Sequence, residues 1–486
     1  MNKTFKMKSV ILLLSFFIWT NSLLYAQEWT QSLLQPDCLN HGSASIVVRD
    51  VVKDEVVLEY DGQRALPTAS IQKILPTAAS LKLLGSDYRY STIVGYTGKI
   101  AGGSLQGDLI IKGSGDPTLG SDYFEDNISV QQWLDSIVDQ LKVHKINTIK
   151  GNIIIDDSAV KGQNVPSGWP WADLGNYYGA GHWSINVNNN EYTLIFKQNP
   201  NLGQPTTILG FEPTLPGFEL ANEVLSGPAN SGDRSYIYAS PNGWHGTVRG
   251  TIPKGNGTFS IRGSISNPPT YVGRIIENHL SVHNIQVSGE LVVTKESQSP
   301  TQTLYTHWSP PLKDIARVTN FKSVNLYAEA LMKLICDQPS SSSTFDCGKK
   351  SMMSFYESQG VDVDQGFIVD GSGLSPRNAS SARLFTDILQ TIYKDSTWFS
   401  DFQASLPKMG KEGTVKSMLR NKPSDMVVKA KSGFIGRQRS YSGYIFISTN
   451  KVYSFCIILD NYSCSSSAMR YRIQNFLLKL PQYLER

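Results

Sequence analysis

Both ends of the chain carry short β-rich segments, and this feature most constrains its fold. Near the start, residues 43–60 hold two β-rich runs around a polar turn, which predicts a hairpin. Near the end, residues 444–447 and 452–459 predict two more strands, and residues 468–478 predict a closing helix. We therefore expect one discontinuous α/β domain whose sheet joins the two ends of the chain.

The long stretch between these ends has a different character. Over residues 93–306, short β-rich runs alternate with Gly, Asn and Pro, which predicts a large, mostly-β accessory insert. The chain is also longer than one hydrophobic core usually serves, so two or three domains are expected. The predicted division is a discontinuous domain over 27–92 and 307–486, accessory domain II over 93–186 and 275–306, and a nested accessory domain III over 187–274.

The first 26 residues have the pattern of a secretory signal peptide, in which lysines precede an apolar run that ends near Ala26. No later segment has the roughly 18 consecutive apolar residues of a membrane span. We therefore expect a periplasmic or extracellular protein without a membrane span. The formal charge of +4, without a basic block, argues against nucleic acid as a partner.

The five cysteines cannot all pair within one chain. Cys336 and Cys347 flank a serine-rich loop, and Cys456 and Cys464 flank the end of a predicted strand. These two pairs are the predicted disulfides, which leaves Cys38 free.

Ser70 and Lys73 form a Ser-x-x-Lys pair at the start of a predicted helix. A serine hydroxyl needs a proton acceptor within reach to act as a nucleophile, and positions i and i+3 share one helix face. A lysine with a lowered pKa, kept from water, can serve as that acceptor. Taken alone, the pair is better explained by an N-capping serine beside a solvated lysine. Pro76 predicts a kink or a tightened first turn in this helix.

Three further motifs follow in the chain: Ser323-Val324-Asn325, the glycine-rich turn 370–375, and Lys431-Ser432-Gly433. Taken singly, they are explained as a helix cap, an ordinary turn and a solvated strand lysine. Taken together and in this order, they match the Ser-x-x-Lys, Ser-x-Asn and Lys-Thr/Ser-Gly set of penicillin-recognising serine enzymes.

Within that superfamily the chain resembles the low-molecular-mass class C penicillin-binding proteins, which are D-alanyl-D-alanine carboxypeptidases and endopeptidases. Ser323 follows Lys73 by 250 positions, which matches the large insert of that family. The resemblance implies a penicillin-recognising serine transpeptidase/β-lactamase-like α/β (α+β) fold, with 27–92 and 307–486 as the catalytic domain. Further matching strings are 113–119, 168–173, 370–375, 405–407 and 413–414.

The resemblance also implies the roles of the motif residues. Ser70 would be the acylated nucleophile and Lys73 its base, while Ser323 and Asn325 would relay the proton and position the substrate. By analogy with the superfamily, the N–H of Ser70 and a strand N–H beyond the third motif would form the oxyanion hole.

The third motif would bind the carboxylate at the end of a D-Ala-D-Ala peptide. Lys431 would supply the cation and Ser432, which stands where the family usually has threonine, a hydroxyl; Gly433 completes the motif. The partners implied are peptidoglycan stem peptides, with β-lactams as covalent inhibitors.

Asp173 and Tyr178 match two class C positions that line a pocket for the diamino acid of the stem peptide. An aspartate can pair with the free ammonium of diaminopimelate. A helix-capping role for Asp173 is the alternative. The family often has arginine directly after the final serine of the 370–375 turn, whereas here Pro376 holds that place and Arg377 follows.

Other classes of protein fit less well. A zinc peptidase is disfavoured because the seven histidines form no His-Glu-x-x-His, and no Gly-x-Ser-x-Gly indicates an α/β-hydrolase. A β-lactamase is disfavoured because the sequence identifies no carboxylate dedicated to deacylation. No metal or cofactor is expected. The alternative from another class is a non-catalytic peptidoglycan-binding protein with the same fold, against which the intact motifs argue.

Overall fold

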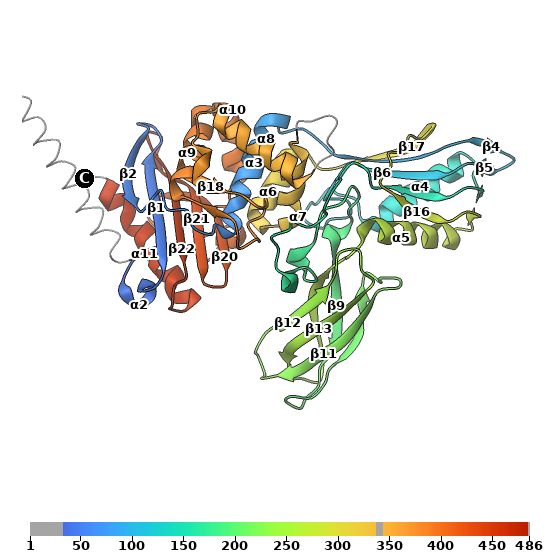
Figure 1. Cartoon of the computed structure of the whole chain (residues 1–486), viewed down its shortest axis with the longest axis horizontal. Coiled ribbons are helices and arrows are strands. Elements are labelled where there is room, and N and C mark those ends of the chain that lie inside the picture. The colour runs from blue at the N-terminus through green and yellow to red at the C-terminus, as the bar shows by residue number, and fades with distance from the viewer. Residues whose placement is uncertain (1–32, 337–343, 485–486) are drawn as a thin grey trace, which may run out of the picture. The chain divides into compact units, whose positions relative to one another are not determined.

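The computed structural model describes residues 33–336 and 344–484 (Figure 1). The predicted signal peptide, residues 1–26, lies outside the described residues. In the described part, no helix is long and apolar enough to cross a membrane.

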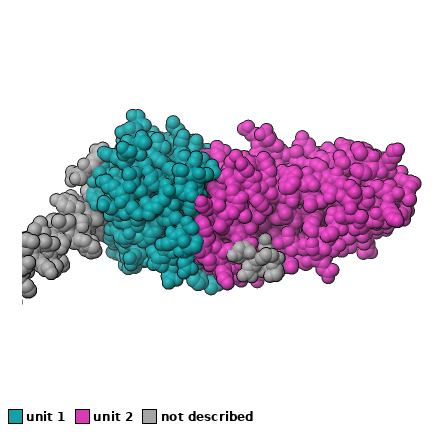
Figure 2. Space-filling model, turned by 90° about the horizontal axis from the view of Figure 1, so that it is seen from above, with its two compact units in different colours: residues 1–74, 356–368, 376–486 teal, residues 75–355, 369–375 magenta. Residues whose placement is uncertain are grey.

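The chain forms two compact units (Figure 2). This division is coarser than the three predicted domains, whose boundaries stay a prediction. It also assigns 75–92 and 307–355, which were predicted as catalytic domain, to unit 2. Unit 1 comprises Met1–Ile74, Tyr356–Ile368 and Pro376–Arg486, and unit 2 comprises Leu75–Phe355 and Val369–Ser375.

Unit 1 is built on a five-stranded antiparallel sheet in the order β2-β1-β22-β21-β20 (Figure 1). The hairpin strands and the last strands of the chain pair directly, with Val47 of β1 opposite Cys456 of β22. The sheet therefore joins the two ends of the chain, as the sequence predicted. The strands are β1 (Ser43–Asp50), β2 (Glu55–Tyr60), β20 (Val427–Ile435), β21 (Gln438–Ser448) and β22 (Lys451–Asp460).

Helices cover this sheet. Side chains of α11 (Ser466–Leu484) share a core with Phe455 and Ile457, which alternation places on one face of β22. Helix α9 (Ala382–Lys394) contacts β1 and β22 as well. Unit 1 also contains α2 (Pro36–Leu39), β18 (Gly366–Phe367), β19 (Ala379–Ser380) and α10 (Ser396–Ala404).

One predicted disulfide is confirmed and the other is wrong. Cys336 pairs with Cys347, but Cys464 pairs with Cys38 and leaves Cys456 buried and free. Ser43, at the start of β1, lies opposite Asp460, at the end of β22. This antiparallel register brings the residues before β1 next to those after β22. The correct pair thus depends on a long-range strand pairing that cysteine spacing does not show.

The insert in unit 2 combines sheets with two long helices that the sequence analysis did not predict. In its five-stranded sheet, ordered β16-β8-β6-β3-β17, strands β6, β8 and β16 are parallel. Parallel neighbours need crossover connections, and helices α4 (Val130–Val143) and α5 (Pro268–Val282) lie in these connections. The strands are β3 (Ser91–Tyr96), β6 (Leu109–Gly113), β8 (Ile153–Asp156), β16 (Leu291–Thr294) and β17 (Gln302–Trp308).

Two three-stranded sheets fall within 187–274, the predicted nested domain. One has the order β10-β9-β14 and the other β11-β13-β12. Their strands are β9 (Glu191–Lys197), β10 (Thr207–Glu212), β11 (Glu219–Gly227), β12 (Arg234–Ala239), β13 (His245–Pro253) and β14 (Thr258–Ser264). A four-stranded sheet in the order β15-β7-β5-β4 contains β4 (Lys99–Ala101), β5 (Ser104–Gln106), β7 (Thr148–Ile149) and β15 (Gln286–Val287).

Unit 2 also contains helices outside the insert. The helix predicted after Pro311 is present as two, α6 (Leu312–Lys322) and α7 (Asn325–Leu334), which meet at the Ser-x-Asn motif. Two helices cross the boundary of the units in sequence: α3 (Ile74–Leu84) and α8 (Phe345–Ser358).

Candidate active site

Ser70 and Lys73 lie in η1 (Ala69–Lys73), a 3₁₀ helix that runs directly into α3. With three residues per turn, a 3₁₀ helix stacks positions i and i+3 above one another. The Lys73 Nζ accordingly lies 3.0 Å from the Ser70 Oγ, and the Lys73 side chain is fully buried. Pro76 falls in the first turn of α3, where the N–H that it lacks has no helical partner. The tightened first turn is therefore found.

The backbone around Ser70 is tightly held. Ala69 has φ of 45°, in the left-handed region that costs a non-glycine residue about 1 kcal/mol or more. The Ser440 Oγ donates a 2.6 Å hydrogen bond to the Thr68 carbonyl. A Cβ on Gly433 would stand 2.9 Å from the Ser70 nitrogen, so only glycine lets β20 approach the backbone of Ser70 this closely.

Lys431 and Gly433 lie on the same face of β20, because side chains alternate along a strand. Lys431 is fully buried, and its Nζ donates a 2.6 Å hydrogen bond to the Ser432 carbonyl. Burial and the charge of the nearby Lys73 hold the pKa of Lys431 well below that of an ordinary lysine. The Ser432 hydroxyl lies 2.8 Å from the Thr414 Oγ1. Unit 1 thus brings together five of the predicted residues: Ser70, Lys73, Lys431, Ser432 and Gly433.

Unit 2 brings together the other predicted residues. Ser323 ends α6 in the left-handed conformation, with φ of 62°, and Asn325 begins α7. The Asn325 side-chain amide donates a 2.7 Å hydrogen bond to the Tyr178 carbonyl. The Tyr178 hydroxyl donates a 3.1 Å hydrogen bond to the Asp173 carboxylate. The second motif is therefore bonded directly to the 173–178 segment.

The Asp173 carboxyl is half-buried at the end of η2 (Trp171–Asp173). Burial raises its pKa, and the hydrogen bond from Tyr178 opposes that shift. The N-cap of η2 is Pro170, so Asp173 does not hold the capping position of this helix. Tyr178, in η3 (Tyr177–Gly179), also has a pKa above its ordinary value, first through burial and then through the charge of Asp173.

One face of α7 holds several loops of unit 2. Asn325, Glu329 and Lys333 are four residues apart and so lie on one side of the helix. Glu329 accepts hydrogen bonds from the amides of Gly371, at 3.0 Å, and Ser372, at 2.8 Å. Burial, followed by the charge of Asp370, raises the Glu329 pKa.

The glycine-rich turn is bonded to the 168–173 string as well. The Trp169 Nε1 donates a 2.8 Å hydrogen bond to the Asp370 Oδ2, which also accepts the Ser375 amide at 2.6 Å. Two strings that the sequence singled out separately therefore form one network. The sequence analysis missed Glu329. Its position, one helical turn after Asn325 in a predicted helix, could have indicated that this acidic residue lies on the same side of the helix. Arg377 is exposed and belongs to unit 1.

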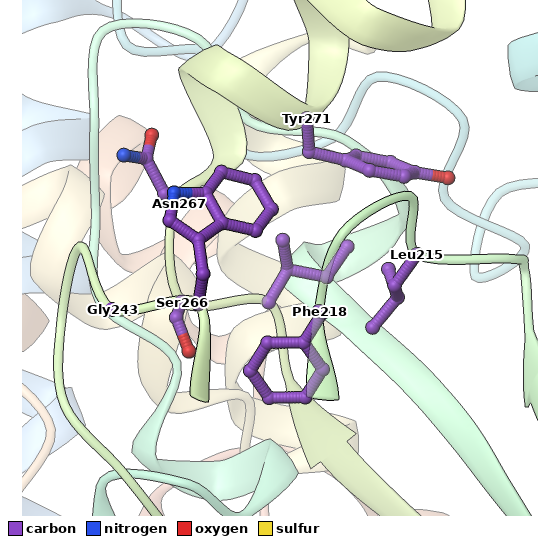
Figure 3. Close-up of a pocket in the computed structure, with 8 residues that line it drawn as sticks. Leu215, Phe218, Gly243, Ser266, Asn267 and Tyr271 are labelled. Carbon is purple, nitrogen blue, oxygen red and sulfur yellow. The ribbon is translucent and has the colours of Figure 1, made fainter. Parts of the chain in front are cut away.

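Two pockets of unit 2 lie apart from these residues. Figure 3 shows an apolar one, where the side chains of Leu215, Phe218 and Tyr271 face a cavity of about 10 Å³. Such a volume holds at most one water molecule. A polar pocket of about 390 Å³ has Glu191 and Arg262 in its lining. Neither lining includes a predicted site residue.

Comparison with known proteins places the chain in a family of carboxypeptidases. The family model described as D-Ala-D-Ala carboxypeptidase 3 (S13) matches residues 26–479. A D-alanyl-D-alanine carboxypeptidase DacB of Haemophilus influenzae is 24% identical over 465 residues, which cover 94% of this chain and 92% of the relative. A D-alanyl-D-alanine carboxypeptidase of Actinomadura is 26% identical over 435 residues, which cover 86% of this chain and 78% of the relative.

Solved structures show the same fold. The crystal structure of penicillin-binding protein 4 (dacB) from Haemophilus influenzae superposes with a TM-score of 0.82 at 22% identity, covering 94% of this chain and 99% of that chain. A second crystal structure of that protein, complexed with a β-lactam, superposes with a TM-score of 0.77 at 21% identity and the same coverage. The fold is therefore that of the penicillin-recognising proteins, as the sequence predicted.

Proposed function

Because the chain belongs to the D-Ala-D-Ala carboxypeptidase 3 (S13) family, we propose that Ser70 is the nucleophile through which it cleaves the D-Ala-D-Ala bond of peptidoglycan stem peptides. The observation that carries the proposal is the 3.0 Å contact between the Lys73 Nζ and the Ser70 Oγ. A buried lysine is poorly solvated as a cation, so its neutral amine can accept the serine proton.

The reaction has two steps. The Ser70 oxygen attacks the carbonyl carbon of the penultimate D-alanine, and the hydroxyl proton passes to the neutral Lys73 amine. The peptide bond then breaks, the terminal D-alanine leaves with a proton on its nitrogen, and an ester remains on Ser70. Water hydrolyses this ester. The motif that they form assigns Ser323 and Asn325 the relay of the proton and the positioning of the substrate.

Lys431 supplies the cation for the carboxylate of the terminal D-alanine, and the Ser432 hydroxyl adds a hydrogen bond. A buried carboxylate and ammonium stabilise one another's charge, so substrate binding opposes the loss of the Lys431 proton. The Ser70 amide and an amide of β20 beyond Gly433 stabilise the oxyanion. The 2.9 Å approach of an added Gly433 Cβ to the Ser70 nitrogen supports this arrangement.

Asp173 and Tyr178 form the proposed subsite for the diamino acid of the stem peptide. Support comes from the hydrogen bond between their side chains and from the bond between Asn325 and Tyr178. Asp173→Ala should slow cleavage of diaminopimelate peptides much more than acylation by benzylpenicillin, which has no such side chain. Tyr178→Phe keeps the ring and should have a smaller effect. Equal losses for both substrates would make Asp173 structural.

β-Lactams should acylate Ser70, since they present a carbonyl and a carboxylate in similar positions; the similar penicillin-binding protein 4 has been crystallised with one. A periplasmic or extracellular location is part of the proposal, supported by the signal-peptide pattern of residues 1–26. Cutting of cross-links, an endopeptidase activity, uses the same chemistry on a bulkier leaving group. In this proposal, 27–92 and 307–486 form the catalytic domain.

The test is release of D-alanine from a stem-type peptide that ends in D-Ala-D-Ala. Wild type should release it, and Ser70→Ala should not. Ser80→Ala is the matched control, because Ser80 is a buried serine of α3 whose hydroxyl donates to the Thr77 carbonyl of its own helix. Peptide binding without D-alanine release by wild type would favour the non-catalytic peptidoglycan-binding protein.

A further inference from the structure

Three potential metal ligands meet between the two helices of the insert. His279 and His283 are four residues apart at the end of α5, so their rings lie on one side of the helix. Asp135 lies on α4. One ligand atom from each residue lies within 4.8 Å of the other two. This group belongs to neither the motif residues nor their hydrogen-bond partners.

The geometry of the first two ligands fits a shared ion. The His279 Nε2 lies 2.9 Å from the Asp135 Oδ1, yet it is buried and makes no hydrogen bond to any described residue. An ordinary ion pair would point the N–H at the carboxylate. Two ligands that each bind zinc at about 2.0–2.1 Å in tetrahedral geometry are about 3.3 Å apart. A small widening of the 2.9 Å separation would therefore admit the ion, with both lone pairs aimed at it instead of at one another.

The surroundings suit a bound ion too. The rings of His279 and His283 are 4.6 Å apart, so a small rotation of the less buried His283 completes the set. The Gln131 Nε2 donates a 3.0 Å hydrogen bond to the Asp135 Oδ1 and orients the carboxylate. Asp135 and His283 are both partly exposed, which leaves a route for the ion from solvent.

We propose that Asp135, His279 and His283 bind one divalent transition-metal ion of the zinc class, which ties α4 to α5. Two imidazoles and a carboxylate are ligands that zinc accepts, and three protein ligands leave a fourth position for water. Because the two helices come from crossovers far apart in sequence, the ion would stabilise the insert. The site is independent of the Ser70 reaction.

Co²⁺ titration of the untagged mature chain tests the proposal, with visible absorption reporting the ligand geometry. Wild type should bind one Co²⁺ per chain, and Zn²⁺ should displace it and raise the melting temperature until a chelator is added. His279→Ala, His283→Ala and Asp135→Asn should each weaken binding by about 100-fold.

His245→Ala is the matched control, because the His245 Nδ1 lies 3.6 Å from the Glu219 Oε2 in an exposed pair without a second histidine. It should bind Co²⁺ as wild type does. The rate of benzylpenicillin acylation shows that each variant is folded. Absence of stoichiometric binding by wild type, or equal binding by wild type and Asp135→Asn, would overturn the proposal and leave an ion pair.

Discussion

Two buried lysines, one in each unit, show how differently the same side chain is used. Lys431 and Lys333 are both fully buried, and burial is the main cause that lowers the pKa of each. For Lys333, whose pKa falls to about 7, the charge of Glu329 opposes the shift. For Lys431, the charge of Lys73 adds to it.

The partners of each lysine explain the contrast. The Lys333 Nζ donates hydrogen bonds to the carbonyls of Gln163 and His182 and lies 3.8 Å from the centre of the Phe345 ring. Those contacts hold a loop and a helix together. Lys431 instead faces a like charge, which makes it difficult for both lysines to be protonated. Like-charge burial of this kind is typical of a reaction site, because it keeps one amine neutral.

The largest effect should follow from changing Lys73, the proposed base. Arginine stays protonated, so Lys73→Arg cannot accept the serine proton, and acylation by benzylpenicillin should fall about 10³-fold. Lys333→Met should lower stability, because two carbonyls lose their donor, but should leave the acylation rate of the folded protein within about twofold. Stopped-flow acylation measures both. A wild-type rate in Lys73→Arg would remove Lys73 as the base.

A smaller effect concerns Lys431 and alkaline pH. Because its pKa is lowered, its ammonium is lost as the pH rises through a value below the ordinary 10.5 of lysine. At pH values above this lowered pKa of Lys431, the KM for a D-Ala-D-Ala peptide should therefore rise about tenfold per pH unit. The same peptide with a C-terminal amide has no carboxylate and should show no such rise. Parallel KM profiles for the two peptides would contradict the role of Lys431.

The smallest effect is expected in the structural network of unit 2. Because the Glu329 pKa is raised, the native state holds a proton that the unfolded state has lost, so stability falls as the pH rises above 4.5, the ordinary pKa of glutamate. Glutamine cannot titrate at this position. Between pH 5 and pH 8, the melting temperature of wild type should therefore fall by about 2–4 °C more than that of Glu329→Gln. Differential scanning calorimetry measures this. Curves of equal slope would show that Glu329 does not contribute.

Local patterns predicted the elements that local chemistry determines. The hairpin over 43–60 and the strands at the end of the chain were visible because short runs of β-branched and aromatic residues mark strands; β1 and β22 are mostly buried. Ser70 and Lys73 were visible because three-residue spacing places them together in a 3₁₀ turn as well as in an α-helix.

Contacts between distant segments were the part that local patterns missed. The Cys38–Cys464 pair depends on the register of β1 against β22, because this register brings together two cysteines that are 426 positions apart in sequence. The bond from Glu329 to the amide of Gly371 likewise depends on tertiary packing, since neither residue belongs to a sequence motif that names the other. Helix α4 is a different case, because its apolar periodicity was present but short β-rich runs around it favoured a mostly-β interpretation.

Direct mapping of the covalent adduct tests the central claim. Benzylpenicillin is incubated with the mature protein, which is then digested and analysed by mass spectrometry. The account predicts one penicilloyl adduct, on the side chain of Ser70, and none in folded Ser70→Ala. An adduct on another residue, or one that persists in folded Ser70→Ala, would contradict the assignment of Ser70 as the nucleophile.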